Sequence, residues 1–457
     1  MTSSDQTIAK AAKQAFEASQ LISAEERVRA LHEIRKELES SKAAILEANK
    51  VDLEEAQADV AAGRLSDSLV KRLDLGKGDK WDQMIQGLLD VANLPDPNGN
   101  VSYASELDEG LDLYRISCPI GVLLVIFEAR PEVVVNIASL AIKSGNTAIL
   151  KGGKESNRTT AIISYAIQTA LARTSLPFTT IQSIQSRADV TSLLQLDQYI
   201  DLVIPRGSNA LVRSIQHGTR IPVMGHADGI CSVYLDESAD EETAVRVVVD
   251  SKINYPAACN AAETLIVHES LLTTIWPSVA RALLSESVTL LCDPPSLFAL
   301  SAHSLSSPLL KPAPYDAYDT EHLSLTLSII TLPSIQHAIT HINTHGSHHT
   351  DCIISQSEKA QSLFVRGVDS AGVYVNASTR FADGFRYGFG AEVGVSTGRM
   401  HARGPVGLEG LCTYKYVLKG KSERKGPIVG EMGSGEGKRP FVHRRIEAKT
   451  LPEDLLR

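Results

Sequence analysis

The sequence predicts an α/β fold with two doubly wound α/β domains and a β-strand arm. Its apolar residues recur at three- and four-residue spacing over residues 5–93, which is the helical period. From residue 120 onward, short apolar runs alternate with helical stretches, and this alternation resumes after Cys259. Strands that alternate with helices favour parallel sheets covered on both faces. A chain of 457 residues with 43% apolar content is long enough for two cores.

The composition points to a small-molecule partner. The net charge of −9 and the pI near 5.8 argue against nucleic acid or an anionic membrane. No apolar run is long enough to span a membrane, and the N-terminus lacks the pattern of a signal peptide. The six cysteines form no C-x-x-C pair and fit reduced thiols. We therefore expect a cytoplasmic protein.

The first part of the chain reads as helices followed by a hairpin. Ser23 to Glu26 has the sequence of a capping box and opens a helix that includes Arg27 to Leu38. The stretch 94–99, LPDPNG, ends the helical region. Residues 101–118 alternate and predict a hairpin arm, which pairs either within the subunit or with a neighbour.

The first α/β region predicts four strands and four helices. Strands are expected at 120–127, 147–150, 179–184 and 200–204, and helices at 131–144, 158–172, 188–194 and 208–216. Parallel sheets of this kind bind nucleotides at the carboxyl ends of their strands. No G-x-G-x-x-G follows any of these strands, so a dinucleotide would bind in another way.

The rest of the chain repeats the alternation. Strands are expected near Leu265 and at 289–292, 323–332, 350–354 and 372–376. A glycine-rich segment covers 381–398, strand-like pieces lie within 411–446, and the polar end is expected to fray. The predicted domains are 1–251, including the hairpin arm, and 252–409, with further strands at 410–446 and a tail at 447–457.

Cys259 is the residue most suited to covalent chemistry. Tyr255-Pro256 disfavours continuation of a helix, Ala257 and Ala258 are small, and a β-prone run resumes at Thr264. This arrangement presents the thiol at a turn before a strand, where a thiolate nucleophile could form. The alternative for a lone cysteine is a small buried apolar side chain.

Two other patterns suggest ligand sites but do not complete them. His337, His341 and His345 fall on one helical face, yet no nearby Cys, Asp or Glu completes a metal site, and histidines are favoured at a helix C-terminus. The stretch 433–438 lacks the first glycine and the final Ser or Thr of a phosphate-binding loop. We therefore expect no metal.

Eight segments, in order along the chain, resemble the γ-glutamyl phosphate reductase family of the aldehyde dehydrogenase superfamily. They are FEARPE, LKGGKES, PRGSNALV, GHADGIC, NYPAACNAAETL, HGSHHTD, VNASTRFADGFRYGFGAEVG and HARGPVGLEGL. The resemblance implies an aldehyde dehydrogenase-like fold in which 1–251 binds NADPH, 252–409 is catalytic and 410–446 supplies oligomerisation strands. It also implies reduction of the acyl phosphate L-glutamyl 5-phosphate through a Cys259 thioester, in proline biosynthesis.

The same resemblance assigns cofactor roles. Lys151 matches a lysine that contacts the adenosine ribose, and Lys154 stands where relatives that prefer NAD often carry an acid, which favours the 2′-phosphate of NADPH. Gly207 and Ser208 match a pair that receives the pyrophosphate at a helix start. Glu321 matches the glutamate that holds the nicotinamide ribose.

Two catalytic groups of hydrolytic relatives are missing. Val223 stands where a glutamate would activate water, and Ala129 where an asparagine would hold the oxyanion, which leaves the Cys259 N–H as one donor. Arg130 is expected to donate the second hydrogen bond to the oxyanion or to bind the acyl phosphate. A structural ion pair is an equally good interpretation of this residue. Expected ligands for the substrate's carboxylate and amine are Asn376, Ser378 and Arg380.

Two other functions fit the same resemblance. A phosphate-independent NAD(P) aldehyde dehydrogenase would oxidise a free aldehyde with water, and Val223 counts against it. A non-catalytic partner of glutamate 5-kinase would share the fold, but Cys259, Lys151 and Glu321 together count against that function. In either catalytic case a homo-oligomer is expected, and glutamate 5-kinase remains a possible partner.

Overall fold

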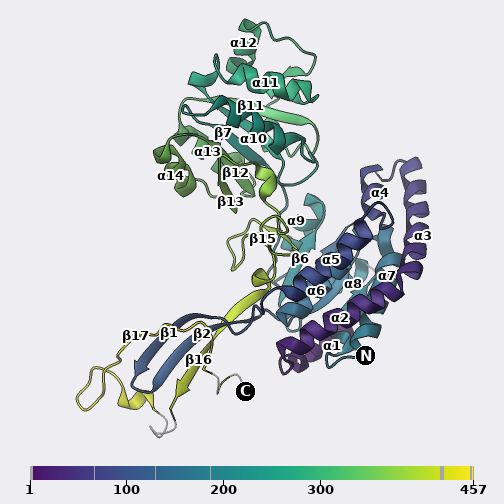
Figure 1. The fold of residues 1–457 in the computed structure, drawn as a ribbon, viewed down its shortest axis with the longest axis vertical. Helices are drawn as coiled ribbons and strands as arrows, with labels where there is room; N and C mark the ends of the chain where they lie inside the picture. The colour runs from purple at the N-terminus through teal and green to yellow at the C-terminus, as the bar shows by residue number, and fades with distance from the viewer. Residues whose placement is uncertain are drawn as a thin grey trace.

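A computed structural model describes residues 4–65, 67–128, 130–185, 187–421, 427–452 and 455. Figure 1 shows three parts: a lobe of helices around a small sheet, a second lobe around a larger sheet, and an extended β-sheet arm that reaches away from both. Both lobes carry parallel sheets, so the predicted α/β fold class is confirmed.

The N-terminal region is helical, as its period predicted. Its helices are α1 (Ser4–Ser19), α2 (Ala24–Ser40), α3 (Lys42–Ala61), α4 (Asp67–Leu73) and α5 (Lys80–Asn93). Ser23 caps α2 by accepting a hydrogen bond from the Glu26 N–H at 3.3 Å. The predicted capping box is only half formed, because the Glu26 carboxylate bonds Ser175 and Arg29 instead.

The first sheet has four parallel strands in the order β5-β4-β3-β6. They are β3 (Val122–Phe127), β4 (Thr147–Lys151), β5 (Ile181–Ile184) and β6 (Leu202–Arg206), joined by α6 (Val133–Ser144), α7 (Asn157–Leu171), α8 (Arg187–Leu193) and α9 (Asn209–Gly218). The chain runs from β3 to one side and then places β6 on the other. The β3/β6 border is therefore a topological switch point, where such sheets bind ligands.

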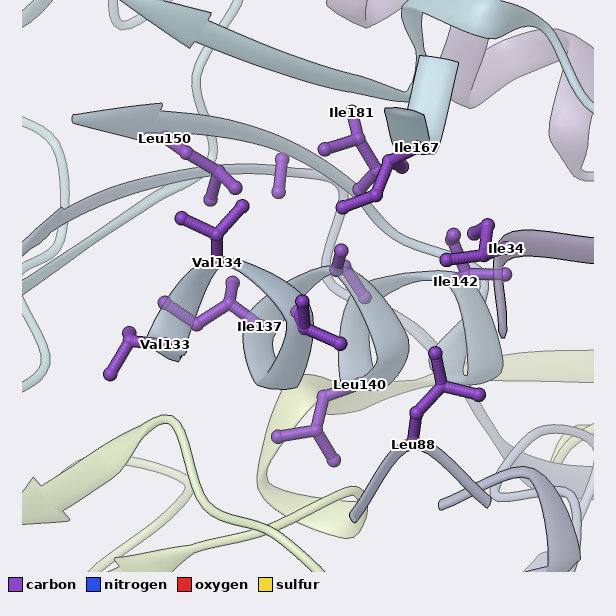
Figure 2. Packing of buried hydrophobic residues seen from close by; sticks show 14 of the residues in the cluster. Ile34, Leu88, Val133, Val134, Ile137, Leu140, Ile142, Leu150, Ile167 and Ile181 are labelled. Carbon is purple, nitrogen blue, oxygen red and sulfur yellow. The ribbon is translucent and has the colours of Figure 1, made fainter. Parts of the chain in front are cut away.

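Helix α6 is the centre of the first core. All of its residues except Asn136 are buried, so it is apolar on every face and not along one stripe. Figure 2 shows Val134 pointing toward Leu150 of β4, with Ile34 of α2 beside Ile142 and Leu88 of α5 beside Leu140. The buried Lys143 is satisfied by the Ala92 carbonyl at 2.9 Å. The helical region and the sheet thus share one core.

The second sheet has seven parallel strands in the order β10-β9-β11-β8-β7-β12-β13. Its strands are β7 (Cys231–Leu235), β8 (Ala262–His268), β9 (Thr289–Cys292), β10 (Leu310–Pro312), β11 (Thr326–Leu332), β12 (Thr350–Ile354) and β13 (Gly372–Val375). Its helices are α10 (Glu241–Ile253), α11 (Trp276–Ser285), α12 (Pro294–Ala302), α13 (Ile335–His345) and α14 (Glu358–Gly367).

The border between the two sheets lies earlier than the predicted division at 251/252. β7 pairs with β8 and β12, and α10 packs against α11, so residues from Cys231 onward belong to the second lobe. The sequence analysis had no strand at β7. It treated GHADGIC only as a motif and so left α10 in the first domain.

The arm is a four-stranded antiparallel sheet in the order β16-β2-β1-β17. The hairpin β1 (Val101–Asp108) and β2 (Leu111–Pro119) pairs with β16 (Cys412–Gly420) and β17 (Arg444–Arg445) of the same chain. The tail is partly ordered, since Val101 N–H donates to the Lys449 carbonyl and Leu451 is buried in the arm core. This corrects the expectation that 447–457 frays. The predicted strand piece GPIVG is also corrected, because its described part contains a 3₁₀ turn at Val429–Glu431.

Two further features complete the described chain. β14 (Gly394–Ser396) and β15 (Gly404–Val406) pair as a small antiparallel ribbon between the lobes. Within the described residues, no helix is long and apolar enough to cross a membrane.

Candidate active site

The two parallel sheets contribute opposite edges to one site. Lys151 ends β4 and Gly207 follows β6, both at the carboxyl edge of the first sheet. In the second sheet, Gly229 precedes β7, Cys259 precedes β8 and His349 precedes β12, all at the amino edge. Arg206, the last residue of β6, is attracted to Cys259 and Glu392. Cys259 therefore lies where the carboxyl end of β6 meets the amino ends of the catalytic strands.

Cys259 is held on a tight turn between α10 and β8. Tyr255 has φ of 61°, a left-handed conformation that non-glycine residues rarely adopt. The Ala258 N–H donates to the Tyr255 carbonyl at 3.1 Å, and the Ala261 N–H to the Ala258 carbonyl at 2.9 Å. Among the described residues, no hydrogen bond uses the Cys259 N–H. The thiol is half-buried, so the predicted presentation at a turn before a strand is confirmed.

Gly229 and Glu321 fix the backbone behind this turn. A Cβ on Gly229 would lie 2.1 Å from the Cys259 carbonyl oxygen, so only glycine fits there. The Gly229 N–H donates to Glu321 Oε1 at 2.9 Å. Burial raises the pKa of Glu321, while the Gly229 hydrogen bond opposes that rise. The structure thus brings the predicted Glu321 into the same cluster as Cys259.

A buried ion pair supports the turn from behind. Lys252 Nζ and Glu263 Oε2 are 2.8 Å apart, and both side chains are almost fully buried. Lys252 also donates to the Ala262 carbonyl, and Glu263 Oε1 accepts from the Leu323 N–H. These contacts connect α10, β8 and the loop of Glu321, so removal of either charge would leave its partner buried and unpaired.

Two histidines stand beside Cys259. One ligand-type atom from each of His226, His349 and Cys259 lies within 4.8 Å of the other two. The imidazole rings of the two histidines meet edge to face at 5.1 Å. Burial lowers the pKa of His226. The cluster can therefore accept a proton from the thiol, or bind a soft metal ion.

Four of the five residues predicted to bind the cofactor end or follow strands at the carboxyl edge of the first sheet, whereas the fifth, Glu321, lies in the second lobe. Lys151 is buried, whereas Lys154 is exposed at the start of a 3₁₀ turn and attracts the Glu55 carboxylate. Ser208 is the N-cap residue of α9, its side chain makes no capping hydrogen bond within the described part of the chain, and its N–H donates to Glu128 Oε2 at 3.0 Å. A carboxylate thus occupies the helix N-terminus where a phosphate group is expected, which shows that this position accepts an anion.

Of the four expected substrate ligands, the two arginines interact with Arg206 or Cys259, whereas the Asn376 and Ser378 side chains are bonded to other residues. Arg380 is buried, is attracted to Cys259, and its Nε has no hydrogen-bond partner among the described residues. Arg130 lies near Arg206 and Glu132. The Asn376 side-chain oxygen accepts from the Ser355 N–H, and its NH₂ group donates to the Ser355 carbonyl, both at 2.9 Å. Asn376 follows β13 at the carboxyl edge of the second sheet, whereas Cys259 lies at the amino edge. Ser378 Oγ accepts from Ser251 and from the Arg380 N–H, so it positions Arg380.

Val223, which stands where hydrolytic relatives carry the water-activating glutamate, is part of the first sheet. Val223 forms a parallel bridge with Val203, and the Met224 N–H donates to the Val203 carbonyl at 2.9 Å, which extends the first sheet beyond β6. Val223 packs against an apolar cluster that includes Ile215 and Ile221. Ala129, the other missing group, lies outside the described residues.

Three residues of this site, Arg206, His226 and His349, were not predicted from the sequence, although each lies in a segment that resembles the reductase family. The signals were present as a basic residue at the end of a strand in PRGS, and as histidines beside glycine in MGHADG and HGSHH. Two of the α13 histidines, His341 and His345, have ring centroids 4.5 Å apart, and His345 pairs with Asp319, whereas His337 bonds to Ser334.

Comparisons with known proteins agree with one another. Residues 3–290 match the aldehyde dehydrogenase family model. The chain is 53% identical to a probable γ-glutamyl phosphate reductase of Schizosaccharomyces pombe, covering 97% of this chain and 98% of the relative. It is 47% identical to the γ-glutamyl phosphate reductase of Saccharomyces cerevisiae, covering 98% and 99%. The crystal structure of the Thermotoga maritima γ-glutamyl phosphate reductase aligns with a TM-score of 0.86 at 36% identity, covering 92% and 99%.

Proposed function

Because the chain belongs to the aldehyde dehydrogenase family, we propose that it is the reductase of proline biosynthesis that converts L-glutamyl 5-phosphate to L-glutamate 5-semialdehyde and phosphate. Relatives of that name match almost the whole chain. The observation that supports this chemistry is the half-buried Cys259 thiol, which two guanidinium groups, those of Arg206 and Arg380, both attract. An acyl phosphate brings a dianionic leaving group and, here, a carboxylate to such a site.

The residues divide the reaction into two covalent steps. The Cys259 sulfur attacks the acyl carbon, the C–O bond to phosphate breaks, and the thiol proton leaves with the phosphate as hydrogen phosphate. His226 lies where it can carry that proton. The chemistry that a nicotinamide would supply when bound is hydride transfer to the thioester carbon. The C–S bond then breaks to release the semialdehyde, and the thiolate takes a proton from solvent.

Arg206 and Arg380 have different tasks in this mechanism. Arg206 follows the β3/β6 switch point and stands between Cys259 and the cofactor edge, so it would hold the departing phosphate. Arg380 approaches from the glycine-rich segment with an unpaired Nε, so it would bind the substrate carboxylate. The unused Cys259 N–H would receive the developing oxyanion.

The described residues fit a nicotinamide dinucleotide, and we expect NADPH. The helix α9 N-terminus already holds an anion, Lys151 ends β4 beside it, and Lys154 adds an exposed ammonium for the 2′-phosphate. Lys154→Glu should weaken NADPH relative to NADH by about tenfold, because it replaces attraction with repulsion. Lys50→Glu, on the exposed surface of α3, is the matched control. An unchanged NADPH/NADH ratio in Lys154→Glu would place the 2′-phosphate elsewhere.

The alternative is a hydrolytic aldehyde dehydrogenase, and the reverse reaction separates the two. Val223 is built into the sheet, so the position where hydrolytic relatives carry the water-activating glutamate holds no base, and a positioned base contributes about 10²- to 10⁴-fold. Oxidation of the semialdehyde with NADP should therefore require phosphate or arsenate. The measurement is NADPH formation in phosphate-free buffer, where at most one equivalent per active site is expected. Multiple turnovers there at a comparable rate would favour the hydrolytic enzyme.

Two variants accompany that assay. Cys259→Ser should abolish turnover while cofactor binding persists, since a serine hydroxyl is a far poorer nucleophile. Cys118→Ser, at a half-buried cysteine of the arm, should retain activity. More than a few per cent of activity in Cys259→Ser would exclude a thioester, and with it both covalent mechanisms.

The setting of the enzyme is also part of the proposal. All six cysteines are free, which supports a reducing, cytoplasmic compartment. The labile acyl phosphate would come from glutamate 5-kinase, and co-sedimentation of the two proteins would reveal a direct contact. We expect a homo-oligomer assembled through the arm.

A further inference from the structure

We infer that Cys259, His226 and His349 form an inhibitory site for a soft divalent cation, with Zn²⁺ as the ion of choice. The inference rests on the proposed function only in naming the consequence, because Cys259 is the nucleophile there. The site itself follows from the geometry of the three side chains.

The three groups are close enough to share one ion. One donor atom of each lies within 4.8 Å of the other two. A tetrahedral zinc ion with Zn–S near 2.3 Å and Zn–N near 2.0–2.1 Å needs its ligand atoms about 3.5 Å apart. Rotation of the half-buried thiol and of the His226 ring would close that difference, while His349 is fully buried and stays in place.

Both imidazoles have the surroundings of metal-bound histidines. His226 Nδ1 donates to the Val395 carbonyl at 2.9 Å, and His349 Nδ1 lies 3.0 Å from the Thr350 hydroxyl oxygen. Such partners fix the ring and leave Nε2 for a metal. His349 Nε2 is buried, and no hydrogen-bond partner for it exists among the described residues. A buried nitrogen in that state is unusual, and a bound cation would satisfy it.

The donor set and the local charge select the ion. One thiolate and two imidazoles suit Zn²⁺, whereas Mg²⁺ and Ca²⁺ require oxygen ligands. Arg206 and Arg380 both act on Cys259 and repel a cation at this place, whereas Glu321 and Glu392 act on His226 and offset part of that charge. Three protein ligands leave a fourth position for water. The inference departs from the expectation that the chain binds no metal, because Cys259, His226 and His349 are distant in sequence and meet only in the fold.

Binding of zinc and acylation of Cys259 exclude each other. The thiol must lose its proton to coordinate the ion, so zinc binding releases one proton and strengthens as the pH rises. Coordination to zinc draws electron density from the sulfur and places the ion with its two imidazole ligands against it, so the bound thiolate is a poorer nucleophile toward an acyl carbon. Zinc therefore holds the thiol in a reversible, protected form from which a chelator or the substrate restores activity.

The test uses the full-length chain freed of metal, with ZnCl₂ and CoCl₂ as probes. We expect one Zn²⁺ per chain by equilibrium dialysis, inhibition that EDTA reverses, and loss of Cys259 alkylation by iodoacetamide while zinc is bound. Co²⁺ should give a sulfur-to-cobalt charge-transfer absorption band that Cys259→Ser abolishes. The dialysis, alkylation and cobalt readouts need no turnover, so they remain informative if the proposed reaction is wrong.

Three histidine variants decide the ligand set. His226→Ala and His349→Gln should each weaken Zn²⁺ binding at least tenfold, a range expected for loss of one ligand contact. Thermal melting confirms that each variant is folded; if His349→Gln is not, the dialysis and cobalt results for His226→Ala stand alone. His337→Ala, on the exposed face of α13, is the control and should bind zinc as the wild type does. Equal Zn²⁺ affinity in His226→Ala, or a cobalt band that survives Cys259→Ser, would overturn the inference.

Discussion

At the scale of single residues, Gly229 limits what the site can tolerate. Its Cα faces the Cys259 main chain so closely that a methyl group would lie 2.1 Å from the carbonyl oxygen. The same residue gives its N–H to Glu321. Because Gly229 has no side chain, the Cys259 turn, the Glu321 carboxylate and the start of β7 can pack against one another.

Gly229→Ala should lower kcat by about 10²-fold, because a displacement of about 1 Å near reacting atoms has that effect. The clash is with backbone, which cannot move aside as a flexible side chain would. The measurement is phosphate-dependent semialdehyde oxidation, with a thermal melt to confirm folding. Gly218→Ala in α9, where the added Cβ meets nothing within 4 Å, is the control. Activity of Gly229→Ala within twofold of the wild type would show that the turn can shift freely.

Residue patterns identified the nucleophile but not its neighbours. Cys259 was found because its turn is local: Tyr255-Pro256, two alanines and the following strand lie within a few positions. Arg206, His226 and His349 meet it only through the arrangement of two sheets, which no local spacing encodes. Asn376 and Ser378 adjoin the glycine-rich segment in sequence, but their side chains bond to Ser355 and Ser251.

At the scale of elements, helix α9 presents its N-terminus to the cofactor edge with a carboxylate already in place. Glu128 follows β3 and Ser208 follows β6, so the two meet across the switch point of the sheet. A pyrophosphate at the same N–H groups must displace Glu128 or lie beside its negative charge.

Glu128→Gln should therefore bind NADPH about two- to fivefold more tightly, which corresponds to about 0.3–1 kcal/mol for a charge near a helix N-terminus. Fluorescence titration with NADPH measures the change in Kd. Glu55→Gln, a carboxylate near Lys154 but away from α9, is the comparison that separates a local from a general charge effect. Unchanged or weaker binding in Glu128→Gln would mean that the pyrophosphate lies elsewhere.

Most elements followed from the period of the apolar residues. The five N-terminal helices, both βαβ regions and the hairpin correspond to predicted stretches. β7 was missed because its five residues follow a loop that had been treated as a motif, and Ser232 and Tyr234 weaken its apolar pattern. The tail was expected to fray because its sequence is polar. The contacts that order it, with Val101 and the arm core, come from a hairpin more than three hundred positions earlier, so the local sequence does not reveal them.

At the scale of the whole molecule, the arm exposes the edge strand β16 together with large apolar side chains. β16 is the last strand of its sheet, and Tyr414, Tyr416 and Leu418 are 55%, 58% and 56% exposed at alternate positions on one face. Exposed edges of this length with large apolar side chains are normally covered.

Replacing Tyr416 and Leu418 together with Lys should dissociate the expected homo-oligomer, because two charges would be buried in the contact between subunits. Analytical ultracentrifugation reports the change in mass. Phe298→Lys, at a residue of α12 that is 77% exposed in the other lobe, is the control. An unchanged mass for the double variant would remove the β16 face from the assembly, while a monomeric wild type would remove the oligomer itself.

The arm also sets the order in which the chain can mature. Ser105 bonds to the Arg444 carbonyl, 339 positions further along, so this sheet has a very high contact order. Both parallel sheets lie within the loop that it closes, and the two lobes can collapse on the ribosome while the arm hairpin waits unpaired. Truncation before residue 412 would leave two folded lobes with an uncovered hairpin, so the last tenth of the chain governs whether a nascent subunit assembles or aggregates.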